Sequence, residues 1–116
     1  MYQYKATLGK VVDGDTIDLV IDLGFKITTN QRIRLAGIDT PEIFSVDRDS
    51  AEYSRGMDAK LFVENRLAAN NNLVTIETEK YTGKYGRYIG TITLADSNMT
   101  LNDELIEKGY ATKVDY

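Results

Sequence analysis

Three carboxylates are placed where short turns could bring them together. Asp15 follows an Asp-Gly pair between two strand-like segments, and Asp39 and Glu42 lie on either side of Thr40-Pro41. Proline holds the residue before it in an extended conformation, so Asp39 and Glu42 can point toward one place. If the segments before Glu42 form an antiparallel meander, the end of the third strand lies beside the start of the second. The sequence therefore predicts one acidic cluster of Asp15, Asp39 and Glu42.

Such a cluster would hold a metal through oxygen. Clustered carboxylates repel one another unless a cation lies among them. The sequence contains neither cysteine nor histidine, so zinc has none of its usual ligands, and oxygen donors favour Ca²⁺ or Mg²⁺. We expect calcium. The alternative is ordinary turn chemistry, which is commoner on spacing alone, because Asp-Gly is a frequent turn and Asp-x-x-Glu a frequent helix start. Asp13 is interpreted as a turn residue or as a partner of a metal ligand.

Cationic and aromatic residues form a second group. Arg34 alternates with Ile33 and Leu35, so it lies on the opposite face of a strand from them and can reach the mouth of a barrel. Guanidinium groups bind phosphate through paired hydrogen bonds, and tyrosine rings stack on bases. The alternative to a phosphate-binding patch is an ordinary solvated hairpin that carries lysine and tyrosine side chains. The other members of the group fall in and around one loop: Lys80, Tyr81, Lys84, Tyr85 and Arg87.

Composition limits what these residues can do. A chain of 116 residues, 42% of them hydrophobic, predicts a single folded domain over residues 1–116. No apolar run reaches the roughly 18 residues of a membrane span, and the N-terminus lacks the pattern of a signal peptide. The formal net charge of −4 argues against indiscriminate binding of polyanions, so a local basic patch must hold any nucleic acid. We expect a monomer with no membrane association.

The elements that must position these residues follow from apolar patterning and turn residues. Strands are predicted over 4–12, 16–23, 31–36, 73–79 and 88–94, and helices over 51–69 and from Thr100 to Gly109. Asp49-Ser50 and Thr100 are the predicted helix caps. The long helix is predicted to bury Met57, Leu61 and Ala68, with Phe62, Val63 and Leu67 widening that face, and the short helix to turn Leu101, Leu105 and Ile106 inward.

This order of elements favours one fold class. Three strands, a helix, two strands and a helix predict an α+β, mainly β, protein. Five short strands are too few for an ordinary sandwich and fit a closed Greek-key barrel of the OB-fold, with one long inserted helix and a short C-terminal helix.

Three sequence blocks, in this order and at these separations, resemble the signature blocks of staphylococcal nuclease-like domains. They are Val11-Val12-Asp13-Gly14-Asp15-Thr16, Arg34-Leu35-x-x-Ile38-Asp39-Thr40-Pro41-Glu42 and Lys84-Tyr85-Gly86-Arg87. The likeness continues through residues 62–65 and 105–111, and so covers nearly the whole chain. One departure is Gly83, where the family usually has an acidic residue.

The resemblance implies an OB barrel and a role for each matched residue. Asp15 and Asp39 would be direct calcium ligands, with the main-chain carbonyl of Thr40, and Glu42 would be the general base. Arg34 and Arg87 would hold the phosphate, while Lys84 and Tyr85 would touch a neighbouring phosphate.

The activity that the resemblance implies is calcium-dependent hydrolysis of DNA or RNA, leaving 3′-phosphate and 5′-hydroxyl ends. Two alternatives stay open. One is a catalytically inactive OB-fold module that binds single-stranded nucleic acid or protein. The other is a calcium-binding structural domain, which would explain the acids but not the arginines.

Overall fold

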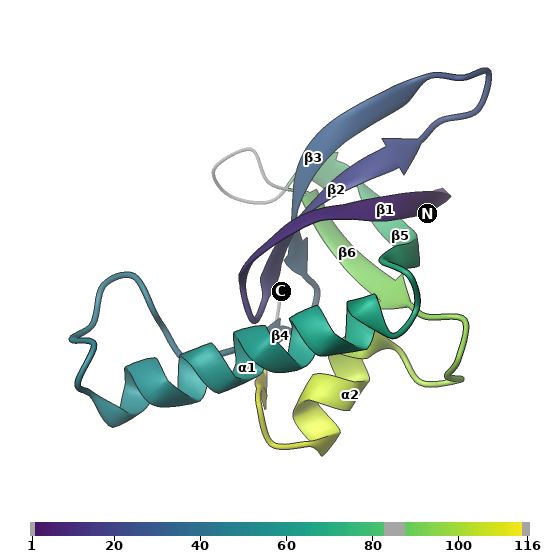
Figure 1. The fold of residues 1–116 in the computed structure, drawn as a ribbon. Coiled ribbons are helices and arrows are strands. Elements are labelled where there is room, and N and C mark those ends of the chain that lie inside the picture. The colour runs from purple at the N-terminus through teal and green to yellow at the C-terminus, as the bar shows by residue number, and fades with distance from the viewer. Residues whose placement is uncertain (1, 83–87, 115–116) are drawn as a thin grey trace.

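Five strands close into a barrel around one hydrophobic core (Figure 1). The computed structural model describes residues 2–82 and 88–114. The order around the barrel is β1-β2-β3-β6-β5, and every neighbouring pair is antiparallel except β3 and β6. The five-stranded OB-fold barrel is therefore confirmed. The strands are β1 (Tyr2–Asp13), β2 (Thr16–Asp22), β3 (Thr28–Leu35), β5 (Leu73–Thr82) and β6 (Tyr88–Thr93).

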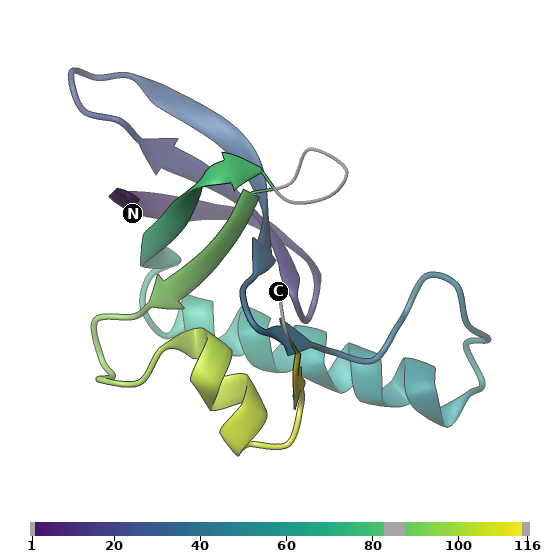
Figure 2. The ribbon, with the colours of Figure 1, turned by 180° about the vertical axis from the view of Figure 1, so that it is seen from behind.

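Two helices accompany the barrel, and both begin at the predicted caps. In α1 (Ala51–Ala68) the Ser50 hydroxyl accepts the N–H of Tyr53 at 3.1 Å. In α2 (Leu101–Glu107) the Thr100 hydroxyl accepts the N–H of Asp103 at the same distance. Each cap satisfies a donor that the first turn of a helix leaves unpaired. Figure 1 and Figure 2, seen from opposite sides, show α1 running across the end of the barrel where β1 turns into β2.

The buried face of α1 differs from the predicted one. Val63 and Leu67 are fully buried as expected, but Leu61 is 55% exposed and Ala68 is exposed as well. Small residues, Gly56 and Ala59, occupy the first half of the buried face instead. A search for large apolar side chains at helical spacing misses such a face, because the helix there packs closely through its backbone. In α2, Leu101 and Leu105 are buried as predicted, and Ile106 packs at the edge of the core.

The structure contains a second, two-stranded sheet that the sequence patterns did not predict. It pairs β4 (Ile38–Asp39) with β7 (Thr112–Lys113), and the Val114 N–H donates to the Gly37 carbonyl at 2.9 Å. Strands of two residues are too short to show an alternating pattern. This sheet holds the segment around Asp39 against the chain that follows α2.

A buried asparagine joins α2 to the barrel. The Asn102 amide donates to the carbonyl groups of Ala36, at 2.9 Å, and Gly90, at 3.2 Å, and accepts the N–H of Ile92 at 3.1 Å. Because buried polar groups are costly unless hydrogen-bonded, this arrangement fixes α2 against the ends of β3 and β6. No helix among residues 2–82 and 88–114 is both long and apolar enough to cross a membrane.

An ion-pair network ties α1 to α2. The Arg66 guanidinium makes two hydrogen bonds to the Glu104 carboxylate, at 2.8 and 3.1 Å, and two to Asp96, at 2.8 and 3.0 Å. Glu104 is buried, so little water reaches its carboxylate and Arg66 is the partner that satisfies it. Hydrogen bonds to the Asp96 and Glu104 carboxylates raise the pKa of Arg66 above its usual value.

We predict that Arg66→Met destabilises the fold. The substitution keeps the apolar stem but leaves the Glu104 carboxylate buried without its cation, and breaking such a pair costs about 3 kcal/mol. Chemical denaturation of Arg66→Met measures this loss.

Arg32→Met is the matched control, since Arg32 pairs with Asp18 at the surface, with 47% of the arginine side chain exposed. Because solvent screens an exposed ion pair, this substitution should change stability far less than Arg66→Met does. Equal losses in the two variants would show that burial of Glu104 has no part in the effect.

Candidate active site

Asp15 joins two distant segments of the chain. It lies in the turn between β1 and β2, where its N–H donates to the Asp13 carboxylate at 3.0 Å, as a turn role for Asp13 requires. One Asp15 carboxylate oxygen accepts the Thr16 hydroxyl at 3.1 Å, and the other accepts the Thr40 N–H at 3.1 Å. The Asp15 carboxylate thereby fixes the segment after β4 beside the β1–β2 turn.

Arg34 lies between two of the predicted metal ligands. Its Nη1 is 3.3 Å from Asp15 Oδ2, and its Nη2 is 3.2 Å from Asp39 Oδ1. Only 10% of the Arg34 side chain is exposed, against 53% for Asp39. The structure thus brings Asp15, Arg34 and Asp39 together, with one buried cation shared by two carboxylates.

The ionisation of these acids reflects their crowding. Burial, together with the neighbouring Asp15 carboxylate, raises the pKa of Asp13 to about 7. Burial also works against ionisation of Asp15, but hydrogen bonds from Asp13 and the Thr40 N–H, with the Arg34 charge, bring its pKa below the usual value. The pKa of Asp39 is raised, first by burial and then by repulsion from Asp15. Among the described residues, Arg34 is thus one positive charge in contact with two carboxylates.

The Glu42 carboxylate is held in its own turn. Its Oε1 accepts the N–H groups of Ile43, at 3.1 Å, and Phe44, at 3.0 Å, so the carboxylate caps its own turn. Among residues 2–82 and 88–114, no group of three or more acidic side chains is placed to hold a metal. That finding goes against a metal site of three carboxylates, but Glu42 still adds to the raised pKa of Asp39, and its predicted role as general base stays a prediction.

The remaining oxygen donors suit a hard cation. The described donors beside the carboxylate pair include Thr40, which is buried and whose Oγ1 has no hydrogen-bond partner in the described part of the chain. Calcium takes carboxylate and carbonyl oxygens in flexible geometry. Two like charges, incompletely neutralised, and an unsatisfied buried oxygen nearby fit such an ion. Asp15, Asp39 and the Thr40 carbonyl are the residues that would hold it.

Close packing of α1 positions the loops of the site. A Cβ added at Gly14 would lie 2.7 Å from the Ala59 Cβ and 2.9 Å from Thr40 Cγ2. A Cβ added at Gly56 would overlap Ile43 Cγ2 and lie 2.6 Å from the Pro41 carbonyl oxygen. Real Cβ atoms essentially never come this close to their neighbours. The turn before Asp15 and the 41–43 segment therefore both rest on the small-residue face of α1.

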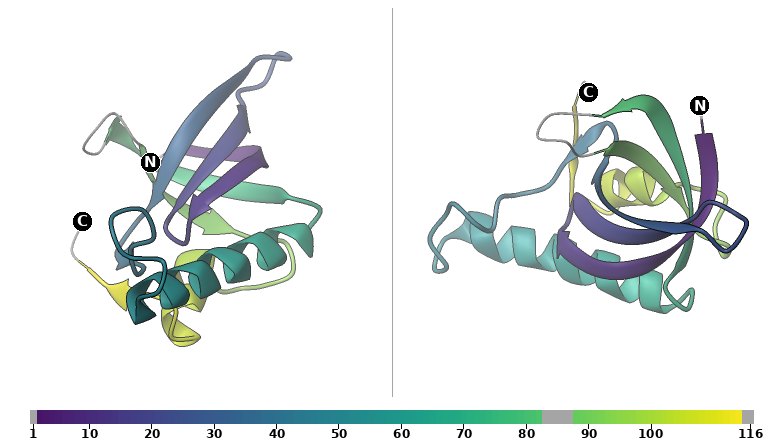
Figure 3. Two further views of the ribbon diagram at one scale, coloured as in Figure 1. Left: turned by 60° about the vertical axis from the view of Figure 1, so that its left-hand side comes forward. Right: turned by 90° about the horizontal axis from the view of Figure 1, so that it is seen from above.

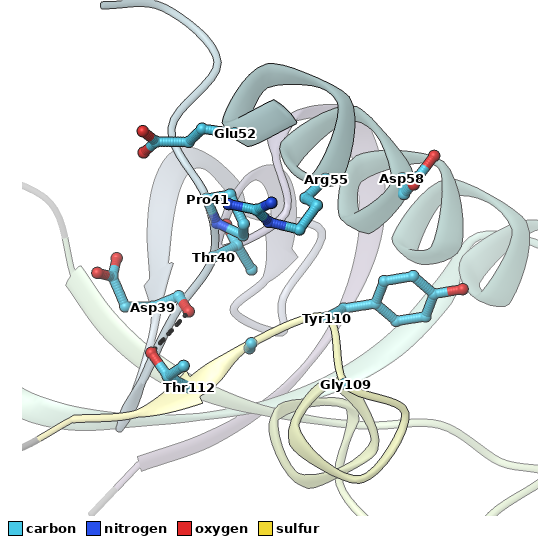
Figure 4. Close-up of a pocket in the computed structure, with 10 residues that line it drawn as sticks. Asp39, Thr40, Pro41, Glu52, Arg55, Asp58, Gly109, Tyr110 and Thr112 are labelled. Carbon is cyan, nitrogen blue, oxygen red and sulfur yellow. Dashed lines mark hydrogen bonds between the residues drawn. The ribbon is translucent and has the colours of Figure 1, made fainter. Parts of the chain in front are cut away.

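A cavity of about 440 Å³ opens beside Asp39 and Thr40 (Figure 4). Glu52, Arg55 and Asp58 line it from α1, and Tyr110 and Thr112 line it from the chain after α2. The Thr112 hydroxyl donates to the Asp39 carbonyl at 3.4 Å, the contact that is dashed in Figure 4. Sequence reasoning missed these residues, although the spacing of Glu52, Arg55 and Asp58 places them on one side of a helix.

The predicted phosphate and substrate residues Arg87, Lys84 and Tyr85 lie outside the described residues. Of the predicted site residues that the structure describes, Asp15, Arg34, Asp39 and Thr40 come together, and Glu42 lies in the segment that follows them.

The fold and the site define an OB-barrel domain with a buried arginine between two carboxylates. The sequence matches the family described as Staphylococcal nuclease homologue over residues 32–116, and the chain belongs to this family.

Individual relatives agree with this assignment. The chain is 31% identical over 125 residues to an uncharacterized protein of Methanocaldococcus jannaschii, covering 93% of this chain and 58% of the relative. It is 26% identical over 112 residues to endonuclease YhcR of Bacillus subtilis, covering 94% of this chain and 9% of the relative. It is 34% identical over 103 residues to thermonuclease of Staphylococcus intermedius, covering 88% of this chain and 55% of the relative. The chain thus spans less than two thirds of each of these relatives.

We predict that Gly56→Ala destabilises the protein although alanine favours helices. Alanine would gain about 1 kcal/mol in helix propensity. The new methyl group, however, must displace Ile43 or the Pro41 carbonyl. Such overpacking typically costs about 1–3 kcal/mol, and two overlaps at one position should make the cost exceed the gain. Thermal unfolding should show a lower melting temperature.

Ser54→Ala, on the exposed side of α1, serves as the matched control. It should leave the melting temperature unchanged or slightly raised. A Gly56→Ala protein as stable as the parent would contradict close packing of α1 on the 41–43 segment.

Proposed function

We propose that the protein is a nuclease that hydrolyses phosphodiester bonds of DNA or RNA, with calcium held by Asp15, Asp39 and the Thr40 carbonyl. The observation that carries the proposal is the buried Arg34 guanidinium between the Asp15 and Asp39 carboxylates. Membership of the staphylococcal nuclease homologue family supports it, as do relatives named thermonuclease and endonuclease.

Arg34 suits the charge that develops during hydrolysis. A planar guanidinium offers parallel N–H donors that match two oxygens of a phosphate. Burial strengthens this interaction because little water competes for the donors. The ion pairs to Asp15 and Asp39 hold the guanidinium in place before substrate arrives, so little reorganisation is needed when charge builds up on phosphorus. Calcium, when bound, would supply Lewis-acid polarisation of a phosphate oxygen.

Glu42 is the proposed general base. Both of its hydrogen bonds to backbone N–H groups fall on Oε1, which fixes the side chain. Oε2 is then the oxygen that would take the proton of the attacking water. The water oxygen forms a bond to phosphorus while the bond from phosphorus to the 5′ oxygen breaks. The products are a 3′-phosphate and a 5′-hydroxyl, whose oxygen takes up a proton on leaving. Arg87, Lys84 and Tyr85 are proposed to complete the hold on the substrate phosphates.

We predict that the protein digests single-stranded DNA or RNA in calcium, that excess chelator stops digestion, and that Glu42→Gln lowers turnover at least about a hundredfold. Glutamine keeps an Oε1 that can accept the N–H groups of Ile43 and Phe44, so the turn should survive. It has no carboxylate to take a proton. Initial rates on a labelled oligonucleotide measure the effect.

The control variant is Glu64→Gln, an equal change of charge on the exposed face of α1. Its rate should stay within about twofold of the parent. Absence of calcium-dependent cleavage in the parent, with oligonucleotide binding retained, would instead favour a catalytically inactive binding module.

A further inference from the structure

A second cavity lies at the end of the barrel away from α1. Its volume is about 290 Å³, and its walls come from the start of β1, the β2–β3 hairpin, β5 and the start of β6. The view from above in Figure 3 looks onto this end of the barrel, where the β2–β3 hairpin extends beyond its neighbours. Three tyrosines, Tyr2, Tyr4 and Tyr88, line it, along with the polar side chains of Thr29, Gln31 and Thr78.

The chemistry of this cavity matches a nucleobase. None of the lining residues that the structure describes is charged. Tyrosine rings offer flat apolar faces for stacking, and the hydroxyl and amide groups can pair with the edge of a heteroaromatic ring. Its volume is close to the lower limit, about 300 Å³, of pockets that bind small molecules. There is room for one base rather than for a helix or a strand of a protein partner.

The cavity and the proposed phosphate site are formed in part by neighbouring residues of β3. Ile33 lies in its wall, and Arg34 is the next residue of β3. Tyr88 pairs with Ile33 in the parallel ladder between β3 and β6. Ile33 belongs to the barrel core and Arg34 points to the opposite side of β3, which is hydrogen-bonded to β2 and β6 on its two edges, so a nucleic acid that uses both sites must pass around the rim of the barrel. A single strand with unpaired bases bends more readily than a duplex, which favours it as the ligand.

We propose that this mouth of the barrel, lined by Tyr2, Tyr4 and Tyr88, binds an unpaired base of a single-stranded substrate. The inference rests on the proposed function, because it assumes that the ligand is a nucleic acid. The protein would then contact bases as well as phosphates. Such binding tolerates many sequences, since every base has a face that can stack. It would also help a chain with a net charge of −4 to bind a polyanion, because stacking adds affinity that needs no cation.

The test is a comparison of two short single-stranded oligonucleotides in chelator, where no hydrolysis occurs. One carries bases, and the other has the same sugar-phosphate length with every base removed. Fluorescence anisotropy gives the affinity for each. The affinity for the oligonucleotide with bases, divided by the affinity for the base-free backbone, isolates the contribution of the bases. We expect a ratio of at least about tenfold for the parent protein. In Tyr4→Leu the ratio should fall at least about fivefold, while affinity for the base-free backbone stays unchanged.

Two further variants make the result decisive. Tyr4 packs against the core, so Tyr2→Leu, at a side chain that is 45% exposed, repeats the test without a packing change. Phe25→Leu is the control, because Phe25 is aromatic and 96% exposed on the same hairpin but does not line the cavity. The Phe25 variant should keep the parental ratio.

Several results would overturn the inference: a parental ratio near one, an unchanged ratio in both tyrosine variants, or an equal fall in Phe25→Leu. Each of these results can be told apart from a failure of the proposed nuclease function. A protein that cleaves in calcium yet shows one of these results keeps the nuclease proposal and loses the base pocket. A protein that never cleaves but shows the expected ratios keeps the base pocket as a binding site.

Discussion

The Arg34 guanidinium between Asp15 and Asp39 is the interaction on which the site depends. A buried charge must be paired, and removing one partner of a buried pair costs about 3–5 kcal/mol. Arg34 comes from β3, Asp15 from the β1–β2 turn and Asp39 from β4, so one cation fixes three separate segments. Among the described residues, two carboxylates contact this one guanidinium, so negative charge exceeds positive charge in that part of the site. That imbalance is the physical basis of the proposed metal site.

Helix α1 supplies the second constraint. It meets the Asp15 turn and the 41–43 segment through Gly56 and Ala59, where any larger side chain would force the loops outward. The opposite end of the same helix is held by Arg66, whose guanidinium joins Asp96 and Glu104. Small residues at one end and an ion-pair network at the other thus set the position of the helix. The helix in turn sets the distance between the two loops that carry the acids.

Regular elements were predictable from sequence because their patterns are local. The five barrel strands and both helix caps follow from alternation, turn residues and side-chain oxygens at helix starts. What depends on packing was not predictable. The exposed Leu61 and the buried Gly56 reflect how closely α1 approaches its neighbours, and β4 and β7 are too short for periodicity. Likewise, spacing predicted that Asp15 and Asp39 would meet, but it could not show that the Glu42 carboxylate would accept the N–H groups of Ile43 and Phe44.

The central claim is that the Asp15 and Asp39 pair, balanced in part by Arg34, is a calcium site. Calorimetric titration of calcium tests it most directly, with the parent, Asp39→Asn and Glu64→Gln compared in the presence of a non-hydrolysable oligonucleotide. Asp39→Asn keeps the size of the side chain and removes one charged ligand, whereas Glu64→Gln removes an equal charge from the exposed face of α1. The account predicts one calcium per chain in the parent and in Glu64→Gln, and at least about tenfold weaker binding in Asp39→Asn. No binding by the parent, or equal affinity in all three proteins, would contradict it.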